Sequence, residues 1–257
     1  MIEQTLLYDG AITLQFDSGR HQYRVINRGR KYKVPSVTRV TGIIDKSGPL
    51  VGWALNSCMD VVRASISPGV EYSETYLEEV FRAAKGRSRG LKDEAASIGH
   101  LAHEWIEEHI RAGCPQEGVV FPAEETPVRS CVDAALKWMG EHSIRFVENE
   151  RPVYSRKHRY SGRMDGLAYV DDALAVVDWK SSNGVYPEYI LQIAAYALAY
   201  KEETGADIRK AFLVRLGKDN GEFEAHELDA RTLKRASGAF LSALNLWRQL
   251  ERLKKKL

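Results

Sequence analysis

The sequence is poor in cysteine and has little charge of either sign in excess. Its three cysteines, Cys58, Cys114 and Cys131, form no C-x-x-C pair, which excludes a zinc finger, a four-cysteine iron–sulfur cluster and a disulfide framework. Thirty-seven Lys and Arg against 35 Asp and Glu leave a net charge of +2, so total charge indicates no nucleic-acid, membrane or acidic partner. No apolar run reaches the roughly 18 residues of a membrane span, and the N-terminus carries no basic, apolar leader. We therefore expect a reducing compartment and no membrane contact.

Enough apolar residues are present for a substantial core, because 44% of the 257 residues are hydrophobic. Turn residues and alternation predict N-terminal strands at 5–7, 11–16, 22–26 and 32–44. Helical periodicity follows from Pro49 to about His142, and then strands over 144–180, a helix over 187–203, two strands within 208–228 and a long helix capped by Asp229. We predict an α/β protein with a central mixed β-sheet flanked by helices, organised as an N-terminal β-hairpin segment (1–48), a helical insertion (49–89) and a core with a C-terminal helix (90–257).

The most informative segment is GRMDGLAYVDDALAVVDWKSS, in which Asp171-Asp172 separates two apolar runs. If these two residues are the turn, Asp165 faces Asp178 with Cβ atoms about 5 Å apart, and Lys180 lies on the same side. A three-residue turn would shift the register and separate the acids. Opposed carboxylates in an apolar strand pair need a cation. Lys180 and Arg163 could supply it as a structural ion cluster, but Mg²⁺ or Mn²⁺ with a neighbouring lysine suits phosphodiester hydrolysis.

Two helices carry further polar side chains. On the helix around 97–107, Gly99 and His103 lie at the edge of the apolar stripe, so His103 is either a hydrogen-bonded core residue or a metal ligand. On the helix over 187–203, Gln192 and Tyr196 lie one turn apart, a pattern that the polar edge of an amphipathic helix also gives.

Together these residues resemble a known family. Gly99-x-x-x-His103, Glu150, Gly162-Arg163-x-Asp165, Asp178-x-Lys180 and Gln192-x-x-x-Tyr196, in this order, resemble the RecB-like branch of the PD-(D/E)XK nucleases over about residues 90–216. The upstream Val34-Pro35-Ser36-Val37-Thr38 is similar to the mitochondrial genome maintenance exonuclease group and its phage and bacterial relatives. Met164 stands where the family motif commonly has proline, and the cysteine framework of the iron–sulfur relatives is absent.

The resemblance implies a restriction-endonuclease-like core and assigns roles to the matching residues. His103, Asp165, Asp178 and the Trp179 carbonyl would bind Mg²⁺ or Mn²⁺, with no iron–sulfur cluster. Lys180 would be the catalytic lysine, and Glu150, Gln192 and Tyr196 would arrange the metal site, the lysine or the DNA. Glu150 or Glu107 could also join the ligands. The resemblance further implies a bacterial or phage-encoded protein in the cytoplasm.

Local clusters of charge predict where DNA would bind. Residues 20–40 contain seven Lys and Arg and no acid, and Lys85–Lys92 form a second acid-free run. Such segments can neutralise phosphates, and Trp53 can stack on a base, although a charged strand edge has the same pattern. The candidate DNA contacts are Arg28, Arg30, Lys31, Lys33, Ser36, Thr38, Trp53, Lys85, Arg89 and Arg163.

The leading hypothesis is a metal-dependent DNA exonuclease acting on single-stranded DNA or on duplex ends. The alternatives are a structure-selective endonuclease, a DNA-end-binding recombination accessory without turnover and a small-molecule metallohydrolase. Cleavage polarity, the number of metal ions, the biological pathway and protein partners stay open.

Overall fold

The computed structural model describes residues 1–115 and 117–256 and divides the chain into two compact units. One unit consists of Met1–Ile43 and Ala102–Leu257, and the other of Ile44–Leu101. The sequence placed a helical insertion at 49–89, and the second unit extends beyond these bounds at both ends. It contains α2 (Ser47–Ser65) and most of α3 (Glu74–Arg111), whose last turns belong to the first unit. None of the helices within the described residues is long and apolar enough to cross a membrane.

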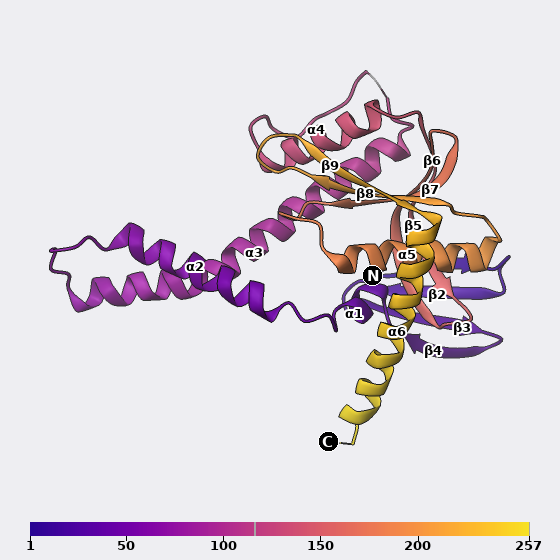
Figure 1. Ribbon diagram of the computed structural model, residues 1–257, viewed down its shortest axis with the longest axis horizontal. Coiled ribbons are helices and arrows are strands. Elements are labelled where there is room, and N and C mark those ends of the chain that lie inside the picture. The colour runs from indigo at the N-terminus through magenta and orange to yellow at the C-terminus, as the bar shows by residue number, and fades with distance from the viewer. Residues whose placement is uncertain (116, 257) are drawn as a thin grey trace. The chain divides into compact units, whose positions relative to one another are not determined.

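The first unit begins with a four-stranded antiparallel meander (Figure 1). Its strands are β1 (Ile2–Leu7), β2 (Ile12–Asp17), β3 (Gln22–Asn27) and β4 (Arg30–Val34). The turn between β3 and β4 is Arg28-Gly29, with both residues at positive φ, as a two-residue hairpin turn requires.

The strand that the sequence predicts over 32–44 is wrong beyond Val34. Pro35 ends β4, and Ser36 caps a short helix, α1 (Val37–Thr41), by accepting a hydrogen bond from the Arg39 amide at 3.1 Å. The β-branched residues of this segment suggested a strand, but Val37 and Val40 are wholly buried in the core against α5. Tertiary packing here overrides local preference.

A five-stranded mixed sheet in the order β5-β6-β7-β8-β9 forms the centre of the same unit. Its strands are β5 (Ile144–Ser155), β6 (Tyr160–Val170), β7 (Ala173–Lys180), β8 (Lys210–Leu216) and β9 (Phe223–Asp229). The helices are α4 (Pro127–Gly140), α5 (Pro187–Thr204) and α6 (Ala230–Lys254). Only β7 and β8 run parallel among the described strands, and α5 connects them. The predicted α/β class with a mixed sheet and flanking helices is confirmed.

Alternation along β7 assigns its two faces to different helices. Trp179 packs edge-on against Trp138 of α4, with ring centroids 5.3 Å apart, whereas Val176 packs in the core with Ile193 of α5. Asp178 and Lys180 have the parity of Val176, so they lie on the α5 face. Figure 1 shows α4 and α5 on opposite sides of this sheet.

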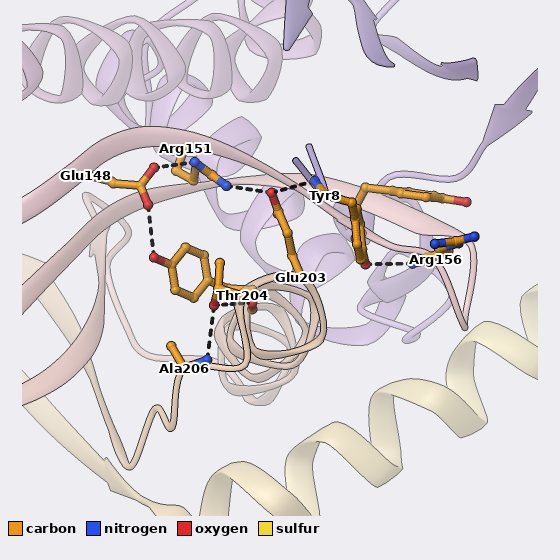
Figure 2. A network of polar contacts seen from close by, with 9 residues as sticks. Tyr8, Glu148, Arg151, Arg156, Glu203, Thr204 and Ala206 are labelled. Atoms are coloured by element: carbon orange, nitrogen blue, oxygen red, sulfur yellow. Dashed lines mark hydrogen bonds and ion pairs between the residues drawn. The ribbon is translucent and has the colours of Figure 1, made fainter. Parts of the chain in front are cut away.

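A polar network ties the first strand of this sheet to α5 and to the N-terminal meander (Figure 2). The Arg151 guanidinium donates to Glu148 at 2.5 Å and to Glu203 at 2.8 Å. The same Glu203 carboxylate accepts from the Tyr8 amide at 3.3 Å, and Glu148 accepts from the Tyr200 hydroxyl at 3.0 Å. Because Arg151 directly follows Glu150, the network fixes the backbone at a candidate site residue.

We expect Arg151→Met to destabilise the fold by about 3 kcal/mol, because it leaves the Glu203 carboxylate, 6% exposed, without its cation. Urea unfolding would measure the change. Arg145→Met is the matched control on the same strand, since Arg145 is exposed and lies over the Tyr169 ring; its expected cost is below about 1 kcal/mol. Equal destabilisation by the two substitutions would contradict the structural role of the network.

Candidate metal site

The β6–β7 hairpin sets the two central carboxylates as the two-residue turn predicts. Asp171 and Asp172 both have positive φ, and the strand register runs from Val170↔Ala173 to Gly166↔Val177. Continued by one position, this register sets Asp165 opposite Asp178, just beyond the last paired residues. There the Asp165 side chain accepts a hydrogen bond from the Trp179 amide at 2.9 Å, so a carboxylate continues the contact between the strands.

Lys180 lies against the same carboxylates. Its ammonium forms an ion pair with Asp178 Oδ2 and donates to the Trp179 carbonyl oxygen at 3.3 Å. The ammonium also lies 5.2 Å from the centre of the Tyr189 ring. Asp178 is fully buried and the Lys180 side chain is 14% exposed, so this charge pair is largely removed from water.

Three side chains that could bind a metal lie close together beside this pair. One donor atom each from His103, Glu150 and Asp165 lies within 4.8 Å of the other two. His103 Nδ1 is 3.8 Å from Asp165 Oδ2 and belongs to the last turns of α3. From sequence, Asp178 is expected to be a ligand and Glu150 either to support the site or to join the ligands. The geometry places Glu150 in this cluster and Asp178 next to it, on Lys180.

Glu150 reaches the cluster through an unusual backbone conformation. Its neighbours pair as Asn149↔Gly166 and Arg151↔Met164, so Glu150 stands opposite Asp165. Its φ is 49°, in the left-handed region that non-glycine residues rarely adopt. Such local strain persists where surrounding contacts fix it, and it commonly marks functional sites.

The cluster carries more negative than positive charge. The pKa of Glu150 is raised to about 8, chiefly by burial and then by the carboxylates of Asp165 and Glu107, against the opposing effect of Arg163. The pKa of Asp178 is likewise raised to about 6, because the effect of burial outweighs the opposing effect of the Lys180 ammonium. Burial also raises the pKa of Asp165. These buried carboxyl groups would all be stabilised as anions by an added cation.

The donor set fits a hard divalent cation. Carboxylate oxygens and one imidazole nitrogen are ligands that suit Mg²⁺ and Mn²⁺. Asp178 Oδ2 is buried against the Lys180 ammonium, with which it forms an ion pair. The alternative ion cluster is formed only in part: the Arg163 guanidinium pairs with Glu3 and lies 3.9 Å from Glu150, while Lys180 pairs with Asp178.

Gln192 and Tyr196 of α5 form the side of the site. The Gln192 amide donates to the Tyr196 hydroxyl at 3.0 Å and lies 3.5 Å from Asp178 Oδ1. Tyr196 packs so closely over Gly162 that any side chain at position 162 would overlap its ring. Gly162 therefore permits the close approach of α5 to β6.

The predicted DNA contacts are distributed over both units. In the first unit, Arg28, Arg30, Lys31 and Lys33 are exposed on β4 and its preceding turn. Thr38 is exposed, Ser36 is buried as the cap of α1, and Arg163 is engaged with acids as described. In the second unit, Trp53, Lys85 and Arg89 are exposed on α2 and α3.

Sequence reasoning missed Tyr189 and gave no role to Gly162. Tyr189 follows Pro187 at the start of α5, and a tyrosine in a first helical turn carries no signal for contact with a distant lysine. A glycine inside an apolar strand does signal close approach of a neighbour, so the role of Gly162 was accessible in principle.

No protein-family model and no curated protein matches the sequence. Among solved structures, an alkaline exonuclease (LHK-Exo) from Laribacter hongkongensis is 18% identical over 48% of this chain and 69% of its own, with a TM-score of 0.27. LHK-Exo in complex with dAMP is 14% identical over 87% of this chain and 94% of its own, with a TM-score of 0.32. SSO0001 is 14% identical over 76% of this chain and 86% of its own, with a TM-score of 0.26. At these scores the likenesses carry no argument about function.

Proposed function

We propose that this chain is a Mg²⁺- or Mn²⁺-dependent deoxyribonuclease of the PD-(D/E)XK type that degrades DNA from ends, with single-stranded DNA or duplex ends as substrate. The observation that carries the proposal is the β6–β7 register, which sets Asp165 against Asp178 with Lys180 in contact with the second acid. The order of motif residues along the sequence supports the RecB-like branch. The proposal includes the cytoplasm of a bacterium or of a phage-infected cell as its setting.

The residues divide into ligands and supporting groups. His103, Asp165 and Glu150 would hold the metal, with Asp178 and the Trp179 carbonyl as further oxygen donors. When bound, such a metal polarises the phosphate and lowers the pKa of a bound water. Lys180 presents an ammonium next to these acids, where it can orient the attacking water and offset the charge that develops on the phosphoryl oxygens.

Gln192 and Tyr196 position the groups that act. The Gln192 amide contacts both the Tyr196 hydroxyl and Asp178 Oδ1. This contact limits how far the buried Asp178 carboxylate can rotate. Tyr196 stays protonated because burial raises its pKa well above the usual value, and it serves as a fixed hydrogen-bond partner. These contacts pre-organise the carboxylate, which lowers the cost of reaching the reactive geometry.

The test is cleavage of end-labelled linear and covalently closed circular single-stranded DNA with Mg²⁺, Mn²⁺ or EDTA. We expect metal-dependent loss of the linear strand and survival of the circle, because only ends are attacked. Cleavage of the circle would favour a structure-selective endonuclease. Binding of DNA ends without cleavage in any metal would reject the proposal and favour a recombination accessory.

A further inference from the structure

A wide groove with a strongly basic lining lies in the first unit, apart from the acidic residues of the metal site. It has a volume of about 950 Å³ and is bounded by β4, α1, the β5–β6 turn and the end of α6. Seven of its lining residues are Lys or Arg, and Glu251 is the one acid among them. The groove thus concentrates a formal excess of six positive charges in a chain whose net charge is +2.

The cations come from segments far apart in the sequence. Lys157 and Arg159 project from the β5–β6 turn, and Arg252 and Lys255 from the end of α6; all four are exposed. From sequence, the segment 20–40, which supplies Lys33 and Arg39 to the groove, was expected to bind DNA, whereas the turn and α6 were not. Folding brings these cations to one surface.

Arg248 holds one wall of the groove in place, and its lowered pKa reflects its burial and the positive charge around it. Its guanidinium donates to the carbonyls of His158 at 2.5 Å and Arg159 at 3.3 Å, which ties α6 to the turn. Burial lowers the pKa of Arg248, and the neighbouring Arg159 and Arg252 lower it further. The one acid of the lining, Glu251, accepts from the Lys254 ammonium at 3.2 Å and lies 3.8 Å from Arg39. One carboxylate cannot neutralise the seven cations of the lining.

The groove is continuous with the strand that carries the metal site. Pro35 lines the groove, and its carbonyl accepts a hydrogen bond from the Ser161 amide at 3.0 Å. Arg159 immediately precedes β6, and Asp165 lies six positions further, about 20 Å along an extended strand. This separation is within the length of a nucleic-acid strand of more than a few nucleotides.

We propose that this groove binds the phosphodiester backbone of single-stranded DNA whose end lies at the metal site. Separated cations match the repeated charge of a phosphate backbone, and Trp247, over which Arg39 lies at 5.7 Å, adds an aromatic surface for a base. A small-molecule pocket has a mostly apolar lining, which this groove does not have. The inference rests on the proposed nuclease function for its choice of ligand.

The experiment measures anisotropy of a labelled oligothymidylate of about 20 nucleotides, longer than the roughly 4–16 nucleotides of a typical binding module. EDTA is present, so cleavage does not interfere. We expect Arg159→Glu/Arg252→Glu to weaken binding by about tenfold or more and to reduce the salt-dependence slope by about 1.4, because two phosphate contacts are lost. The Arg159→Gln/Arg252→Gln pair should show a smaller loss in the same direction.

The matched control is Lys234→Glu/Arg235→Glu, two exposed cations near the start of α6 and outside the groove. If Arg159→Glu/Arg252→Glu binds the oligonucleotide as tightly as Lys234→Glu/Arg235→Glu does, the inference is overturned. If polyglutamate displaces the labelled oligonucleotide as well as unlabelled oligothymidylate does, the inference is also overturned, in favour of an acidic protein partner. Hydrolysis of the p-nitrophenyl ester of thymidine 5′-monophosphate by the unmodified chain with Mn²⁺ tests the metal site separately, so failure of the proposed function and failure of the groove are distinguishable.

Discussion

Asp178→Asn is expected to lower the rate of metal-dependent DNA cleavage by about 10³-fold or more. Asparagine keeps the shape of this fully buried side chain and its contact distance to Gln192, but it removes the anion. Loss of about 4 kcal/mol of transition-state stabilisation corresponds to this factor, and metal-ion catalysis supplies several kcal/mol. End-labelled linear single-stranded DNA with Mn²⁺ gives the rate.

Asp172→Asn is the matched control, because it makes the same chemical change at the exposed turn of the same hairpin. Its φ is 65°, a conformation that asparagine tolerates well, so the fold should be retained. Thermal unfolding with and without Mn²⁺ provides a second readout: metal binding should raise the melting temperature of the control and raise it far less in Asp178→Asn. A cleavage rate within tenfold of the unmodified chain would contradict the role of Asp178.

The hairpin was predictable from sequence because its geometry is local. Two apolar runs separated by two residues fix the register, and the register fixes which side chains are opposed. Asp165, Asp178 and Lys180 therefore follow from counting along the chain. The cap of α6 by Asp229 and the start of α5 at Pro187 follow in the same way, from residues at the ends of the helices themselves.

The cluster of His103 with Glu150 depends on contacts that no local pattern encodes. Glu150 reaches Asp165 through a left-handed backbone that the Arg151 network supports from α5, fifty residues away in the chain. The helix α1 shows the same limit, since its β-branched residues favour a strand until burial against α5 decides the outcome. The basic groove likewise exists only after α6 meets the β5–β6 turn.

Lys180→Met is expected to reduce cleavage by about 10²- to 10³-fold while metal binding persists. Methionine keeps most of the apolar stem beside Tyr189 but removes the ammonium that contacts Asp178 and the Trp179 carbonyl. The carboxylates then lose a neutralising charge, so the Mn²⁺-dependent rise in melting temperature should be at least as large as in the unmodified chain. Single-turnover cleavage together with thermal unfolding measures both quantities.

This pair of readouts separates a catalytic lysine from a lysine that only neutralises buried acids. A purely structural lysine predicts lower stability without metal, recovery of stability with metal, and near-normal cleavage once metal is saturating. Lys210→Met is the matched control on the adjacent strand β8, where the ammonium pairs with Glu227 at 2.8 Å on the surface; it should change neither readout appreciably. Normal cleavage by Lys180→Met at saturating Mn²⁺ would show that the metal alone replaces the charge, and Lys180 would then belong to the scaffold of the site and not to its chemistry.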